Sequence, residues 1–375
     1  MRTKIITIIS HTHNALAFEW VAQFLDREKF EQKFILLNDG PSTLEKDLAA
    51  SNFDVFHINY SGKTDVPKAL MKITRILRRE RPSIVHTHLS DASLLGLMAA
   101  KFVGIKTRVH TRHHSNSNKE YYPGAVKYDL LINKLSTHIV AVSLNVKEYL
   151  VNYEKVDAGK IYIIPHGLNF AETENISQSR MQALRDKYNP EKRSPVIGVI
   201  SRYIHLKGIQ FIIPAFKKLL ETYPNACLVL ANARGNYSTE IKKMLAEIPP
   251  QNYTEIDFEE DLFALYNLFD VYVHVPIDKI CEAFGQTYVE ALACKVPSVF
   301  TLSGIANDFI EHKKNAWVVP YKNSDAIYEG IMTLLSDKEL CGQMVARGYK
   351  DVCDKFTIRH TVNLLEALYT QPVHR

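Results

Sequence analysis

Cysteine is scarce in this chain, whose 375 residues include five, scattered without close pairing. Disulfide frameworks and cysteine-based zinc sites need paired or clustered cysteines, so we expect a protein of a reducing compartment, the cytoplasm, with its cysteines packed in cores. Long apolar runs are also missing, because no stretch approaches the roughly 20 residues that span a bilayer. The sequence begins directly with a strand-like segment, so we expect neither a signal peptide nor a membrane anchor.

Repeats and low-complexity segments are absent as well, and short apolar strands instead alternate with helical segments. This alternation is typical of parallel α/β sheets. The strands predicted in the first half are residues 4–10, 33–37, 53–58, 84–87, 107–110, 138–142 and 161–164. The sequence therefore predicts an α/β protein with a parallel sheet in its first half.

A polar and charged stretch then interrupts the alternation, and a second alternating set follows it. We predict two Rossmann-like domains, residues 1–170 and 195–355, joined by a linker at residues 171–194 that holds one helix near residues 180–188. A last helix lies within residues 356–375. The length of the chain agrees with two domains.

Two glutamates, Glu282 and Glu290, are separated by seven residues in the run E-A-F-G-Q-T-Y-V-E. A strand-like segment precedes them, Gly285 marks a sharp turn, and a short helix is predicted from Thr287 to Ala293. We place Glu282 at the N-terminus of this helix. The unpaired N–H groups of Gly285, Gln286 and Thr287 would there form a cradle for a phosphate. The alternative is that both glutamates are ordinary helix residues.

Two cations, Arg202 and Lys207, flank one strand-to-helix loop upstream of the glutamates. Ligands of open α/β sheets bind at the carboxyl ends of the strands, where such loops converge. An arginine fork with a lysine point charge is the pair expected to neutralise a diphosphate. Arg234, after the next predicted strand, either adds a phosphate contact or is simply solvated.

These two segments resemble the E-x7-E signature and the Gly-Arg to Lys-Gly loop signature of the family 4 retaining glycosyltransferases, with Ser201 where glycine is usual. The resemblance covers essentially the whole chain and implies the GT-B architecture, two Rossmann-like domains facing a central cleft, with the last helix crossing back onto the first domain. It implies that Glu282 meets the donor sugar and Glu290 the ribose. It also implies donor contacts from Arg202 and Lys207 and from the turn residues Phe284, Gly285, Gln286 and Thr287.

The first half departs from the family, whose members usually carry a Gly-Gly turn after the first strand. This chain has side chains there, so His11, His13 and Asn14 become candidates for contact with the acceptor. The alternative is that the histidines line a loop without chemistry. His113 stands where relatives carry a histidine near the donor sugar. Further histidines lie nearby, but without cysteine or acidic partners they are weak signs of zinc, and we predict no metal.

Charge is uneven, since residues 1–170 hold 23 Lys and Arg against 16 Asp and Glu. Lys68, Lys72, Arg75 and Arg79 recur at helical spacing opposite apolar residues and predict a basic amphipathic helix. The helix either contacts an anionic membrane surface from the cytoplasmic side or is a solvated outer helix. Nucleic acid is not expected, because no aromatic residues interleave a basic groove.

Together these observations predict a retaining, metal-independent glycosyltransferase without a cofactor. The donor is a nucleotide diphosphate sugar, with UDP favoured over GDP, and the acceptor is a lipid-linked glycan or a cell-envelope polysaccharide. The catalytic candidates are Glu282, His113, Arg202 and Lys207. Two alternatives stay open: a sugar-nucleotide epimerase of the same form, which needs its own acid and base, and a silent nucleotide-binding subunit, suggested by the missing Gly-Gly turn and by Lys295 in another glycine position.

Overall fold

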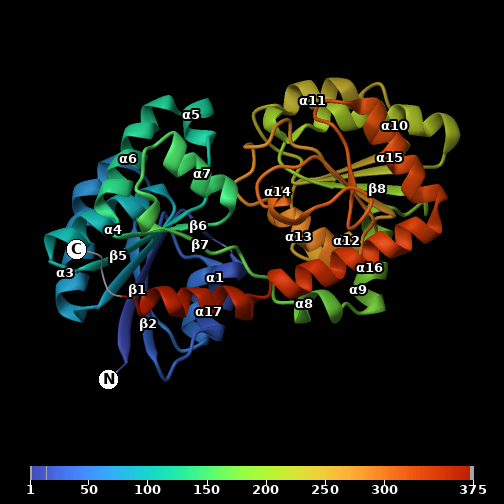
Figure 1. Cartoon of the computed structure of the whole chain (residues 1–375). Coiled ribbons are helices and arrows are strands. Elements are labelled where there is room, and N and C mark those ends of the chain that lie inside the picture. The colour runs from blue at the N-terminus through green and yellow to red at the C-terminus, as the bar shows by residue number, and fades with distance from the viewer. Residues whose placement is uncertain (1, 14, 372–375) are drawn as a thin grey trace. The chain divides into compact units, whose positions relative to one another are not determined.

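The computed structural model describes residues 2–13 and 15–371, without the side chain of Ser117. The chain forms two compact units (Figure 1). The first comprises the residues up to Gly167 together with those from Ile358, and the second comprises Leu168–Thr357. Each unit is built on one parallel sheet covered by helices, so the predicted α/β class with two Rossmann-like sheets is confirmed.

The first unit holds a seven-stranded sheet in the order β3-β2-β1-β4-β5-β6-β7, and every pair of neighbouring strands is parallel. Its strands are β1 Thr3–Ser10, β2 Phe30–Asn38, β3 Asp54–Asn59, β4 Ile84–His88, β5 Thr107–Arg112, β6 His138–Ala141 and β7 Ile161–Ile163. Its helices are α1 Leu16–Phe24, α2 Thr43–Ala50, α3 Val66–Glu80, α4 Ser90–Phe102, α5 Ser117–Tyr121, α6 Val126–Leu135, α7 Leu144–Asn152 and α17 Ile358–Tyr369. Short 3-10 turns occur at Lys63–Asp65, Pro123–Ala125 and Ala158–Lys160.

Alternation along β1 divides the core of this unit between the two faces of the sheet. Ile6 and Ile8 pack with side chains of α3 and α4, whereas Ile9 packs with side chains of α1 and α2. The last helix, α17, joins the α1 side, where Tyr369 donates or accepts a 2.7 Å hydrogen bond at His86 Nδ1. The last helix of the chain therefore belongs to the fold of the first unit.

The second unit holds a six-stranded parallel sheet in the order β10-β9-β8-β11-β12-β13. Its strands are β8 Val196–Ile200, β9 Cys227–Ala231, β10 Tyr253–Ile256, β11 Val271–His274, β12 Ser298–Phe300 and β13 Trp317–Val318. Its helices are α8 Ala171–Glu174, α9 Gln178–Tyr188, α10 Ile209–Thr222, α11 Ser238–Leu245, α12 Leu262–Tyr266, α13 Gln286–Ala293, α14 Ala306–Phe309, α15 Ser324–Ser336 and α16 Lys338–Lys355. Two 3-10 turns lie at His205–Lys207 and Pro250–Asn252.

The stretch expected as a linker, residues 171–194, contains α8 and α9, and it groups with the second unit. Arg180 of α9 donates two 2.7 Å hydrogen bonds to the carboxylate of Asp261, and Tyr188 donates one to Glu259. Polar composition suggested a linker with one helix, which corresponds to α9, and these side chains fix the stretch to the neighbourhood of α12.

Two glycines hold the backbone turns that frame the carboxyl ends of the central strands. Gly208, with a φ of +76°, sits where a Cβ would lie 1.9 Å from the carbonyl oxygen of Val275. Gly285, with a φ of +85°, precedes α13, and a Cβ there would lie 2.6 Å from the ring of Tyr288. Both positions therefore require glycine, for its left-handed backbone and for space.

We predict that Gly208→Ala lowers the free energy of unfolding by about 2 kcal/mol or more, because it adds left-handed strain to a clash with the main chain. Gly342→Ala is the matched control: Gly342 lies inside α16, and a Cβ there meets nothing within 4 Å. The control should raise stability by about 0.5–1 kcal/mol. Chemical denaturation measures both, and equal stabilities of the two variants would contradict the assignment.

Candidate functional site

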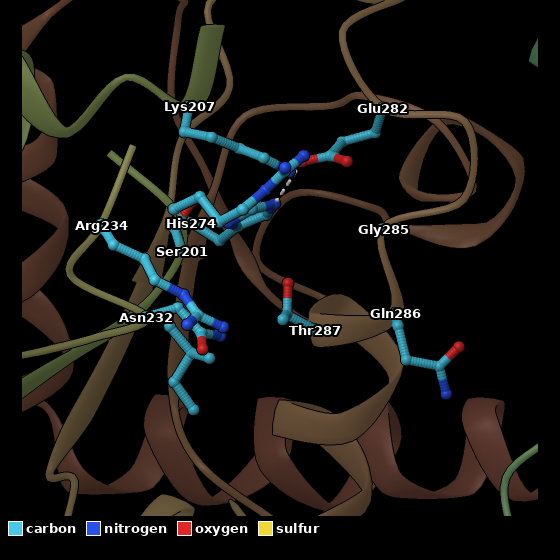
Figure 2. A pocket seen from close by; sticks show the side chains of 11 residues that line it. Ser201, Lys207, Asn232, Arg234, His274, Glu282, Gly285, Gln286 and Thr287 are labelled. Atoms are coloured by element: carbon cyan, nitrogen blue, oxygen red, sulfur yellow. Dashed lines mark hydrogen bonds and ion pairs between the residues drawn. The ribbon is translucent and has the colours of Figure 1, made fainter. Parts of the chain in front are cut away.

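A pocket of about 340 Å³ opens in the second unit at the carboxyl ends of the central strands. Strand order reverses between β8 and β11, and this switch point is where open α/β sheets bind ligands. The lining residues come from the end of β8, from the loops after β8 and β9, from the end of β11, and from the start of α13 and the loop before it (Figure 2). They are Ile200, Ser201, Arg202, Lys207, Asn232, Arg234, His274, Glu282, Gly285, Gln286 and Thr287.

The N-terminus of α13 faces this pocket. The helix begins at Gln286, and no side chain caps it at Gly285. Its first N–H groups therefore remain available to an anion, and the helix dipole adds positive potential. Figure 2 shows Thr287 at the start of the helix, pointing toward the pocket, whereas the side chain of Gln286 points away from Lys207 and Glu282. Gln286 therefore faces the pocket with its main-chain N–H group rather than with its side-chain amide.

Two expectations about this turn need correction. Glu282 does not lie at the helix N-terminus but in the loop before it, where its N–H donates a 3.0 Å hydrogen bond to Ser303 Oγ. Phe284, expected to contact the donor, is absent from the pocket lining: it is buried and packs edge-on against Phe356. A loop hydrogen-bonded to Ser303 and Ile305 separates the glutamate from the helix, and local periodicity did not reveal this loop.

Glu282 is the electrostatic centre of the pocket. Its side chain is buried, ion-paired with Lys207 and hydrogen-bonded to His274 Nε2 at 3.1 Å (Figure 2). Burial by itself would raise the pKa of Glu282, but the charge of Lys207 and the hydrogen bonds from His274 and Lys207 hold that pKa well below its usual range. The carboxylate therefore stays ionised at every physiological pH.

His274 is a site residue that the sequence analysis missed. Its ring is buried at the end of β11, with its edge against Tyr288 at 4.7 Å between ring centroids. Burial lowers the pKa of His274, although Glu282 acts in the opposite direction. The neutral ring must therefore carry its proton on Nε2, where the carboxylate accepts it. A signal existed, because this histidine is the one strongly polar residue in the otherwise apolar run V-Y-V-H-V.

Further positive charge at the pocket comes from Arg202 and Arg234. Both side chains are exposed, and neither forms an ion pair within the described residues. Asn232, a second residue that sequence reasoning missed, lies beside Arg234 with a φ of +59° (Figure 2). Two guanidinium groups without ion-pair partners and one amide thus line the same pocket as the N-terminus of α13. Together they suit an anion with several oxygens.

Ser201 replaces the glycine that is usual in the family signature. It is buried, and within the described chain its hydroxyl has no hydrogen-bond partner. Buried hydroxyl groups normally find a partner. This hydroxyl lines the pocket, so a bound ligand can supply the missing one.

Glu290, the second glutamate, is in a different electrostatic state. It lies on α13, outside the pocket lining, and accepts a 3.0 Å hydrogen bond from the hydroxyl of Tyr266. Burial raises the pKa of Glu290 to about 7, and the hydrogen bond from Tyr266 offsets only part of this effect. No cation pairs with it among the described residues. The two glutamates of one motif therefore differ in charge near neutral pH.

The remaining candidates belong to the first unit. His11, with a φ of +51°, pairs with Asp91 at 2.8 Å, and the exposed His13 lies 3.2 Å from Asp39. Asn14 lies outside the described residues. The structure thus gives both histidines carboxylate partners and leaves their predicted role as acceptor contacts open to experiment.

His113 follows β5 and sits in a stack of histidines. Its Nε2 lies 3.0 Å from Nδ1 of His88, and its ring stacks on His166 with 5.2 Å between centroids. Burial, reinforced by the neighbouring His166, His86 and His114, lowers the pKa of His113 well below its usual value, so the ring is neutral. Among the described residues, no group of three or more His, Cys, Asp or Glu is arranged to hold a metal ion.

Comparison with known proteins agrees with this geometry. A model of the glycosyl transferases group 1 matches residues 180–351, and a model of glycosyltransferase family 4 matches residues 19–172. The capsular polysaccharide biosynthesis glycosyltransferase CapM of Staphylococcus aureus is 26% identical over 98% of this chain and 96% of its own. An Escherichia coli enzyme, UDP-Gal:alpha-D-GlcNAc-diphosphoundecaprenol alpha-1,3-galactosyltransferase, is 23% identical over 94% of this chain and 92% of its own.

Among solved structures, HepE of Anabaena in complex with UDP and glucose superposes with a TM-score of 0.82 at 17% identity, covering 98% of this chain and 99% of its own. The fold and these family matches define a nucleotide-sugar glycosyltransferase of GT-B type. The chain belongs to glycosyltransferase family 4, the group 1 family.

We predict that His274→Phe lowers kcat by about 10- to 100-fold while affinity for the nucleotide changes little, because it removes a charge-assisted hydrogen bond to Glu282. The acidic limb of the pH–kcat profile should also move to higher pH, since the pKa of Glu282 rises without this donor. His274→Gln is the control: its amide can donate from nearly the same place. If both variants behaved alike, His274 would be only a packing residue.

The raised pKa of Glu290 makes a further prediction about stability. The folded state binds the proton of Glu290 more tightly than the unfolded state, so its contribution is favourable below about pH 4.5 and is lost as pH rises through about 7. Relative to the wild type, Glu290→Gln should therefore gain up to about 3 kcal/mol between pH 4.5 and pH 8. Thermal unfolding of both proteins across this range measures the difference. A pH-independent difference would contradict the prediction.

Proposed function

We propose that this glycosyltransferase is a retaining, metal-independent enzyme that moves a sugar from UDP to a hydroxyl group of a lipid-linked glycan or a cell-envelope polysaccharide. The observation that carries the proposal is the pocket, in which a helix N-terminus and three cations surround one permanently ionised glutamate. The ligands and substrates of two relatives support the choice of UDP: one binds UDP and glucose, and another takes UDP-Gal to a diphosphoundecaprenol acceptor.

The diphosphate of the donor would lie against the start of α13, with Arg202, Arg234 and Lys207 around its oxygens. These groups are preorganised, so they stabilise the charge that develops on the leaving diphosphate as the bond to the sugar breaks. The ammonium group of Lys207 has three donors. It can thus keep its contact with Glu282 and still reach a phosphate oxygen. Positive charge from the protein then takes the place that a metal ion fills in other transferases.

Glu282 would orient the donor sugar by accepting hydrogen bonds from its hydroxyl groups, and Glu290 would accept from the ribose. His113 is proposed at the sugar, with His11, His13 and Asn14 at the acceptor. These assignments follow the family resemblance. Attack on the same face as the departing diphosphate lets a phosphate oxygen take the proton of the acceptor, so we assign no separate general base.

A cytoplasmic site of action is part of the proposal. The five cysteines are all free, as a reducing compartment requires. No helix within the described residues has the length and apolar character needed to cross a bilayer.

The first test is the thermal stability of the purified protein with UDP, GDP, ADP and CMP, each with and without EDTA. We predict that UDP stabilises the protein and that the shift survives EDTA; at about 100 times the dissociation constant it corresponds to roughly 2.7 kcal/mol. Stabilisation that needs a metal ion would overturn metal independence, and a shift with GDP alone would overturn the choice of base.

Glu282→Ala separates binding from transfer in the same assay. The variant should keep the UDP shift, because Lys207 loses its internal partner and remains free for the diphosphate, yet transfer from a UDP-sugar should fall below detection. Lys217→Ala, which removes an exposed lysine paired with Glu247 on the surface, is the control and should change neither property. An active Glu282→Ala enzyme would falsify the proposed role.

A further inference from the structure

The helices α3, α4 and α6 form one layer on the same face of the first sheet (Figure 1). The middle helix, α4, packs against both neighbours. Its Leu95 and Ala99 join the core with Ile73 of α3, whereas Leu97 joins a cluster with Ile132 of α6. Outward-facing side chains of the three helices therefore belong to one continuous surface, which we call the α3–α4–α6 face.

This face carries a strong excess of positive charge. Five Lys and Arg residues lie on α3, one on α4 and two on α6, against one acid on each helix. The acids offset only part of this charge. Glu80 accepts hydrogen bonds from Lys33 and from Arg79 of its own helix, whereas Asp91 pairs with His11 and the buried Asp129 lies 3.3 Å from His114.

The opposite layer has the reverse balance. Helices α1, α2 and α17 pack together on the other face of the sheet and carry two Lys and Arg against four Asp and Glu. A general basic composition would charge both layers alike. The excess of Lys and Arg is therefore specific to the α3–α4–α6 face, and it favours binding of an anionic partner there.

Large apolar side chains are exposed among these cations. On α3, Met71 is 57% exposed, and at the end of α4 Phe102 is 72% exposed, with the guanidinium of Arg78 5.2 Å from its ring centroid. Met98 is exposed one turn before Phe102. The surfaces of soluble monomeric proteins seldom expose several large apolar side chains next to each other.

Helix α6 shows the same mixture in one stripe. Lys127, Leu130, Leu131 and Lys134 recur at helical spacing and are all exposed, with the exposed Tyr128 beside them and the ammonium group of Lys127 5.1 Å from its ring centroid. A stripe of two leucines between two lysines suits an interface where the apolar parts enter the acyl region and the lysines reach the headgroups.

We propose that the α3–α4–α6 face docks on an anionic lipid bilayer, with Phe102, Met71, Leu130 and Leu131 entering the headgroup boundary and the surrounding Lys and Arg side chains binding lipid phosphates. The structure thereby extends the basic helix expected from Lys68, Lys72, Arg75 and Arg79 to a surface of three helices. On α3 itself Lys72 is only half-exposed, and Arg78 joins the exposed set. The inference deepens the proposed function, since it rests on the lipid-linked acceptor proposed there.

A bilayer fits this surface better than a protein or nucleic acid. Cations here surround exposed aliphatic and aromatic side chains on convex helix faces, and lipid offers both phosphates and acyl chains to them. A nucleic acid would need stacking aromatics along a basic groove. A protein partner would bind independently of lipid charge, so the experiment below separates these occupants.

The test is co-sedimentation of the full chain with vesicles of phosphatidylcholine alone and of phosphatidylcholine with phosphatidylglycerol. We expect binding to the anionic vesicles that weakens with salt and little binding to the neutral ones. Lys127→Glu with Lys134→Glu should lower the partition coefficient by about tenfold or more. The matched control, Lys242→Glu with Lys243→Glu on α11 of the second unit, changes the net charge equally and should bind as the wild type does.

A second pair of variants tests insertion rather than charge. Phe102→Ser with Leu131→Ser should reduce the part of binding that resists high salt, because these side chains enter the boundary themselves. Equal binding of the wild type and both double variants to anionic vesicles would overturn the proposal, as would wild-type binding that ignores lipid charge.

The outcome does not depend on catalysis. The UDP-induced thermal shift of each surface variant should equal that of the wild type, because the pocket lies in the other unit. A protein that binds UDP but not vesicles would therefore refute the docking surface alone. One that binds vesicles but no nucleotide would refute the proposed donor site alone.

Discussion

The candidate site depends on one buried ion pair, between Glu282 and Lys207. A carboxylate in a pocket of this kind would take up a proton if it stood alone, because burial penalises its charge. Lys207 and the neutral His274 keep it ionised, and Glu282 in turn stabilises the charge of the partly buried Lys207. Removing either partner leaves the charge of the other uncompensated. The loops that carry Glu282 and Lys207 are therefore held together by the same interaction.

The fold brings these groups together through backbone positions that tolerate no side chain. Gly208 lets the loop after β8 pass against the carbonyl of Val275 and so delivers Lys207, while Gly285 turns the chain into α13 beneath Tyr288. β11 contributes His274 from its last position. The parallel sheet places the ends of these strands at one edge, so residues distant in sequence meet without any long insertion.

Much of this arrangement can be predicted from the sequence, because it rests on local signals. Strand and helix periodicity predicts β11 and α13, and paired cations after an apolar strand predict a loop for phosphate. The tertiary details are less accessible. Nothing local tells that Glu282 leaves the helix for a loop bonded to Ser303, that Phe284 turns inward onto Phe356, or that polar residues 171–194 attach to α12. His274 was visible as a polar residue in an apolar strand, yet its partner is known only from the fold.

The two glutamates of the motif then explain how the pocket matches a diphosphate in charge. Lys207 is already balanced by Glu282, and Glu290, with its pKa raised to about 7, lies outside the pocket lining. The groups left uncompensated are Arg202 and Arg234, with the dipole of α13. Two arginine charges thus match a diphosphate of about two negative charges. Arginine can also bind phosphate oxygens through two parallel hydrogen bonds.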